Sequence, residues 1–127
     1  KETRLFSSVM RGINKVSRDH IMKVAFDDEF VTPCVASKKL AIVSETGDVF
    51  PCEILQKKIG NIKDANYNLK TILRSNKNKE IKKWIKDTKC KCTFECAAAA
   101  SVVWNIENYP KLVSAATKSF FRDRTKI

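Results

Sequence analysis

Five cysteines are the residues of this 127-residue chain whose type and spacing point to chemistry. They stand at positions 34, 52, 90, 92 and 96. An odd number of cysteines without a secretory pattern argues against a disulfide framework and favours thiolate ligation of a metal. Buried core thiols are the plainer alternative. We favour a metal, because three of the five fall within seven residues and have charged neighbours.

The cysteine spacing separates two kinds of metal site. A [4Fe–4S] cluster needs four soft ligands, which proteins commonly draw from one short loop and from distant positions. Cys90, Cys92 and Cys96 form such a short group, where we expect a loop to enter a helix whose N-terminal amides favour thiolates. Four-cysteine zinc sites usually combine two close pairs, whereas here 17 residues separate Cys34 from Cys52. The spacing disfavours zinc, which stays as the alternative metal.

The first half of the chain predicts one long helix and one hairpin. Apolar residues recur at steps of three to five between Glu2 and Lys23, which predicts an amphipathic helix. The segment 26–33 loses this period, carries three acidic residues and ends at Pro33, so we expect a linker. From Lys39 to Glu53, two apolar runs flank turn residues, which predicts a β-hairpin. This hairpin would bring Cys34 near Cys52.

The second half predicts short helices that cover the hairpin. A turn is expected at 59–62, with Gly60 free to take a positive φ. Short helices are expected at 69–74 and at 79–86, the second with Ile81, Trp84 and Ile85 on one face. Two further helices are expected, one along the alanine run that continues to residue 104 and one after Pro110. The predicted fold class is α+β, a small β-hairpin with flanking helices around a cysteine-ligated metal cluster.

Three sequence elements resemble a known family. The stretch Gly47-Asp48-Val49-Phe50-Pro51-Cys52 resembles the G-x4-C signature, often G-D-V-Y-P-C, of the SPASM and twitch auxiliary-cluster domains of radical S-adenosylmethionine enzymes. Ile59-Gly60-Asn61 resembles their I-G-N element. The segment 90–96 is similar to the C-x-C-T-x-E-C ending of a subset of these domains.

The resemblance implies one [4Fe–4S] cluster in a twitch-like domain, because a full SPASM domain has more cysteines and holds two. It implies Cys34, Cys52 and Cys96 as ligands, with Cys92 or Cys90 as the fourth. Residues 1–33 would be a helical connection to a barrel and 34–127 the auxiliary-cluster domain. The C-x3-C-x2-C motif of the radical-generating cluster is missing from these residues. This chain alone should therefore not cleave S-adenosylmethionine, which the barrel would bind.

Charge and composition limit the possible partners. The net charge is +11, and the stretch 57–92 alone carries +9. A zinc-stabilised basic module for an acidic partner or nucleic acid is therefore the alternative function. We do not expect nucleic acid, because Tyr67 and Trp84 are too few for a stacking platform.

The remaining expectations concern the missing barrel, the compartment and one histidine. The expected partners are the barrel in the same polypeptide and a peptide or small-molecule substrate. The chain starts at Lys1 without an initiator methionine, so we expect a piece of a longer protein. No apolar run is long enough to span a membrane, and the expected compartment is the cytoplasm. His20 is expected to be an exposed or hydrogen-bonded helix residue rather than a ligand or base.

Overall fold

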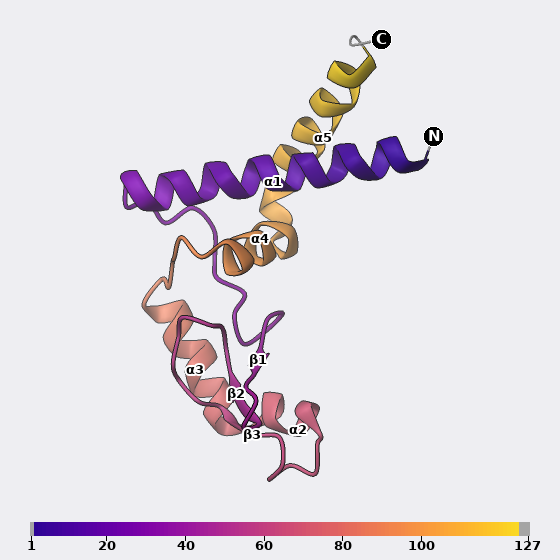
Figure 1. Ribbon diagram of the computed structural model, residues 1–127. Coiled ribbons are helices and arrows are strands. Elements are labelled where there is room, and N and C mark those ends of the chain that lie inside the picture. Colours follow the sequence, from indigo (N-terminus) through magenta and orange to yellow (C-terminus); the bar gives the residue numbers. More distant parts are fainter. Residues whose placement is uncertain (1, 125–127) are drawn as a thin grey trace. The chain divides into compact units, whose positions relative to one another are not determined.

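The computed structural model describes residues 2–124, which form two compact units. The sheet unit comprises residues 33–91, and the helical unit combines residues 2–32 with residues 92–124. The described residues contain five α-helices and one small three-stranded sheet (Figure 1). The predicted α+β class is confirmed.

The sheet unit is built on the predicted β-hairpin. Strand β1 (Ile42–Val43) pairs antiparallel with β2 (Asp48–Phe50), with Ile42 opposite Phe50. Gly47 ends the connecting turn with a φ of +91°, a conformation that glycine adopts without steric cost. Gly47, the first residue of the G-x4-C element, therefore allows the turn that leads directly into β2.

Strand β3 (Gly60–Asn61) replaces the turn that the sequence predicted at 59–62. Gly60 lies opposite Val49 and Asn61 opposite Asp48 in an antiparallel pairing, and Ile59 N–H donates to the Val49 carbonyl at 2.7 Å. The positive φ expected at Gly60 was wrong. A Cβ atom there would lie 3.2 Å from Cγ2 of Ile72, so this glycine permits close approach of a helix.

Helices α2 (Leu69–Arg74) and α3 (Asn76–Asp87) cover the sheet, as predicted. Asn68 caps α2 by accepting from Thr71 N–H at 3.3 Å, and Ser75 caps α3 in the same way at Asn78. The two helices bury three isoleucines against Val49, namely Ile72, Ile81 and Ile85. Trp84, which the sequence places on the same helix face as Ile81 and Ile85, is not buried with them. Trp84 is 39 % exposed, and the Lys57 ammonium lies 4.7 Å from its ring centroid.

The helical unit contains the long predicted helix α1 (Glu2–Phe26), α4 (Glu95–Trp104), a 3₁₀ turn (Ile106–Asn108) and α5 (Tyr109–Arg124). Both α4 and α5 pack against α1, and Figure 1 shows α5 crossing α1 near its middle. Gly12 lies at this crossing. A Cβ on it would come within 2.9 Å of the Ala116 backbone nitrogen. The small residues therefore set the distance between the two helices.

The end of the linker is fixed to the helical unit by a buried hydrogen bond. Asn108 Nδ2 donates to Thr32 Oγ1 at 3.1 Å and to the Val102 carbonyl at 3.2 Å. Within the part of the chain that the structure describes, no helix is long and apolar enough to cross a membrane.

Candidate metal centre

Three of the five cysteines lie at the apolar core of the sheet unit. Cys52 belongs to this core and is only 7 % exposed, while Cys34 and Cys90 are partly buried and pack against it. The shared core residues are Ala36, Val49, Ile59, Ile72, Ile81 and Ile85. Thiols that are separated by up to 56 positions in sequence thus face one water-poor region.

The backbone around Cys52 and Cys34 is held by hydrogen bonds. Cys52 follows β2 directly after the buried Pro51, and Leu55 N–H donates to its Sγ at 3.3 Å. An amide donor of this kind stabilises a thiolate and tunes a metal bound to it. The loop after Cys34 is joined to the same place, because Ser37 N–H donates to the Pro51 carbonyl at 3.3 Å.

The end of α3 directs Cys90 back toward the core. Lys89 adopts a left-handed φ of +47°, and its N–H donates to the Lys86 carbonyl at 3.1 Å. Cys90 N–H donates to the Ile85 carbonyl at 3.0 Å. This pair of bonds is a Schellman motif, in which the residue after the left-handed position contacts the last buried turn of the helix. The sequence does not signal this motif, because Lys89 occupies the position at which glycine usually marks it.

Cys92 and Cys96 belong to the helical unit. Cys96 is exposed and is the second residue of α4, and Cys92 is partly buried in the segment before that helix. The predicted entry of a loop into a helix at this group is therefore present. The N-cap residue Phe94 makes no side-chain cap hydrogen bond, so no side chain at the N-cap competes for the first amides of α4.

A polar cluster joins the two glycine-containing motifs beside β2. Asn61 Nδ2 donates to Asp48 Oδ1 at 2.7 Å, and the Lys58 ammonium lies 2.6 Å from the same oxygen. These two hydrogen bonds, that of Lys58 first, lower the pKa of the Asp48 carboxyl below its ordinary value. Neither motif by itself indicates that Asp48 and Asn61 would form a pair. Their pairing across neighbouring strands follows from the register of β3.

The donor set suits a soft metal centre. Each of the five cysteines carries a thiol. Among residues 2–124, no three cysteine, histidine or carboxylate side chains lie close enough together to hold a metal ion. The structure therefore gathers three thiols at one core without a closed site, and the chemistry of the donors is what fits a thiolate-bound cluster.

Comparison with protein families decides the identity of the domain. The model of the SPASM iron–sulfur cluster-binding domain matches residues 34–97, half of the chain. The chain belongs to the SPASM family. The SPASM match begins at Cys34 and ends one residue after Cys96, so it includes all five cysteines and both glycine-containing motifs. No curated protein and no solved structure matches the chain significantly.

Proposed function

We propose that this SPASM domain binds a single [4Fe–4S] cluster and serves as the auxiliary-cluster domain of a radical S-adenosylmethionine enzyme. The ligands would be Cys34, Cys52, Cys96 and one of Cys90 and Cys92. In this proposal the cluster positions the substrate of the parent enzyme or relays electrons, and the domain alone is not catalytic. The observation that carries the proposal is the family match over a segment that contains five thiols.

The surroundings of Cys52 support a cluster rather than an isolated core thiol. An apolar shell limits the access of water to iron, and amide donors to sulfur stabilise the ligand anion. Cys52 has both features, since it is buried in the core and accepts the Leu55 amide. An inert core cysteine needs no such donor.

Five thiols for four positions leave one choice open. Cys90 packs on the same core as Cys34 and Cys52, which favours it as a third ligand from the sheet unit. Cys92 has the three-residue spacing to Cys96 that resembles the family pattern. A cluster bound by these residues would supply one-electron chemistry or a Lewis-acidic iron site.

Reconstitution of the full chain with iron and sulfide under anaerobic conditions tests the cluster. We expect a brown protein with broad visible absorption and about four iron atoms per chain, because a [4Fe–4S] cluster occupies four thiolates. Electron paramagnetic resonance of the reduced protein should give the signal of a single cluster. A colourless protein that holds stoichiometric zinc would refute the proposal in favour of a zinc-stabilised module.

Serine variants identify the ligands. Cys34→Ser, Cys52→Ser and Cys96→Ser should each lose most of the bound iron, because serine is a poor ligand for iron–sulfur clusters. Of Cys90→Ser and Cys92→Ser, one should lose iron while the other keeps the wild-type content. The second variant is thus the matched control. Full iron retention in Cys52→Ser would exclude the proposed site.

The assignment to a radical enzyme is tested by the coding sequence before Lys1. We expect a barrel-length segment that contains C-x3-C-x2-C, joined to the domain through residues 1–33. Exposed apolar side chains of α1, among them Leu5, Phe6 and Met10, would be available for contact with that barrel. A coding sequence without this motif would refute the assignment to a radical S-adenosylmethionine enzyme. It would not affect the proposal that the domain binds a cluster.

A further inference from the structure

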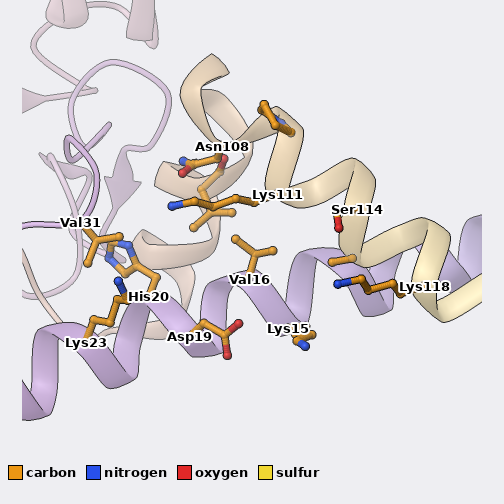
Figure 2. Close-up of a pocket in the computed structure, with 13 residues that line it drawn as sticks. Lys15, Val16, Asp19, His20, Lys23, Val31, Asn108, Lys111, Ser114 and Lys118 are labelled. Carbon is orange, nitrogen blue, oxygen red and sulfur yellow. The ribbon is translucent and has the colours of Figure 1, made fainter.

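A cavity of about 520 Å³ lies within the helical unit, between α1 and α5 (Figure 2). This volume is in the range of small-molecule sites. Part of its wall is apolar, formed by Val16, Val31, Val102, Pro110 and Ala115. None of the five cysteines is among the residues that line the cavity, so the cavity is not part of the proposed cluster site.

The charged part of the wall is strongly cationic. Lysines from both helices line the cavity, namely Lys15, Lys23, Lys111 and Lys118, and the only acidic residue among the described lining residues is Asp19. Lys23 is paired outside the cavity with Glu29 at 3.3 Å. The other three lysines make no ion pair with a carboxylate among the described side chains. Their charges are therefore not neutralised by a carboxylate among the described residues.

His20 contributes a buried polar atom to the same wall. The residue is 5 % exposed, and its Nδ1 has no hydrogen-bond partner among the described residues. The expectation of an exposed or hydrogen-bonded His20 was wrong for this atom. Buried polar atoms are nearly always paired, and an unpaired one requires an explanation. A ligand oxygen beside the ring would supply the missing partner.

A second cavity continues the positive surface along the same two helices. It is lined by Arg11, Arg18 and Arg122 and shares Lys15 and Asp19 with the first cavity. Its wall also includes Ser119, whose buried hydroxyl has no partner among residues 2–124. Basic side chains therefore extend the length over which an anion would be attracted.

We propose that the cavity between α1 and α5 binds a small organic anion, with its apolar part against Val16 and Val102 and its carboxylate or phosphate among Lys15, Lys111 and Lys118. An apolar wall and cationic side chains are the two features that such a ligand requires. A purely inorganic ion would use only the cationic side chains. This site is independent of the cluster proposed above.

The single histidine makes the test specific. The imidazole signals of His20 in ¹⁵N-labelled full-length chain report on this cavity alone, because the chain has no other histidine. We would titrate the protein with phenyl phosphate, benzoate, inorganic phosphate and benzyl alcohol. The first two should shift the His20 signals to saturation, and the better of them identifies the anionic group. Benzyl alcohol should cause no saturable shift at the same concentrations.

Matched charge variants separate a site from a general positive field. Lys111→Gln and Lys118→Gln should each weaken binding of the better aromatic anion about threefold to tenfold, because each removes one charged contact. Asp19→Asn should tighten binding. Lys70→Gln on α2 changes the net charge equally but lies in the other unit, so it should leave affinity unchanged.

Four outcomes would overturn the proposal, of which the first three concern the aromatic probes and the charge variants. These three are the absence of saturation with both aromatic anions, equal binding of benzyl alcohol, and equal weakening by Lys70→Gln and Lys111→Gln. Tighter saturable binding of inorganic phosphate than of phenyl phosphate would also overturn it, because the apolar wall would then contribute nothing.

Discussion

Asn61 Nδ2 donates a 2.7 Å hydrogen bond to Asp48 Oδ1, and this bond joins the I-G-N element to the G-x4-C element across strands β2 and β3. The Lys58 ammonium contacts the same oxygen at 2.6 Å. Because Asp48 starts the strand that ends at Phe50, two residues before Cys52, the bond helps to fix the strand that leads to this cysteine. The two motifs therefore stabilise the same pair of strands, β2 and β3.

Removing the Lys58 charge should raise the pKa of Asp48. In Lys58→Met the carboxylate loses its strongest partner, so its pKa should move up toward the ordinary value of 3.8. A lowered native pKa contributes stability that is present above the unfolded-state pKa and is lost as the pH falls through the native one. The variant should therefore lose less stability than wild type below about pH 4.

A carboxyl-carbon NMR titration of Asp48 measures this change directly. Lys63→Met is the control, because Lys63 is the last of the causes of the shift and acts only through its charge. It should move the pKa less than Lys58→Met does. Equal shifts in the two variants would show that the general positive charge, not the hydrogen bond, lowers the pKa.

Acidification should destabilise the helical unit through His20. Burial lowers the pKa of His20 below 6.5, because a charged imidazole loses its hydration in the core. As the pH falls, His20 is therefore protonated at a higher pH in the unfolded chain than in the native one. Stability should be full above pH 6.5 and should fall as the pH drops from there to the native pKa, below which the loss stops.

Urea unfolding at several pH values, together with the NMR titration of His20, checks this window. His20→Gln should flatten the pH dependence of the free energy of unfolding as the pH falls below 6.5. Asp19→Asn, one residue earlier on the exposed side of α1, is the control and should keep the wild-type slope in this range. An unchanged slope in His20→Gln would contradict the assignment.

A side chain at position 12 should destabilise the crossing of α1 and α5. In Gly12→Ala the new methyl group would lie 2.9 Å from the Ala116 nitrogen, a backbone atom that cannot rotate away. Overpacking should cost about 1–3 kcal/mol of the free energy of unfolding, despite the better helix propensity of alanine. Asn14→Ala, at an exposed position of the same helix, should be neutral or slightly stabilising. Chemical denaturation of both variants compares them.

Asn78 should be required for the loop that follows Cys34. It is fully buried, donates to the Leu73 carbonyl at 2.7 Å and accepts from Ser37 Oγ. Asn78→Ala leaves these two groups without partners and should cost about 1–3 kcal/mol. Because Ser37 lies three residues after Cys34, the variant should also bind less iron after reconstitution.

The matched control for this change is Asn76→Ala, which removes an exposed amide from the same first turn of α3. Its stability and iron content should stay close to wild type. If Asn78→Ala kept the wild-type iron content despite its lower stability, the loop would not position Cys34.

Local patterns were sufficient for most elements. The apolar period predicted α1, the helix expected at 69–74 coincides with α2, and the turn residues around Gly47 predicted the β1–β2 hairpin. These features depend on residues near one another in sequence, where backbone propensity and caps act. The five thiols and two motifs likewise pointed to the SPASM family without any coordinates.

Tertiary contacts decided the rest. Gly60 is in a strand because β2 offers it a partner, Trp84 is exposed although Ile81 and Ile85 on the same helix are buried, and His20 is buried under elements almost a hundred residues away. The sequence by itself determined that the chain carries thiols in a SPASM pattern and which short elements hold them. Only the tertiary structure decided that Cys90 packs against the core that contains Cys52, and that α1 and α5 together line a cationic cavity. Both features depend on packing between segments that are distant in sequence.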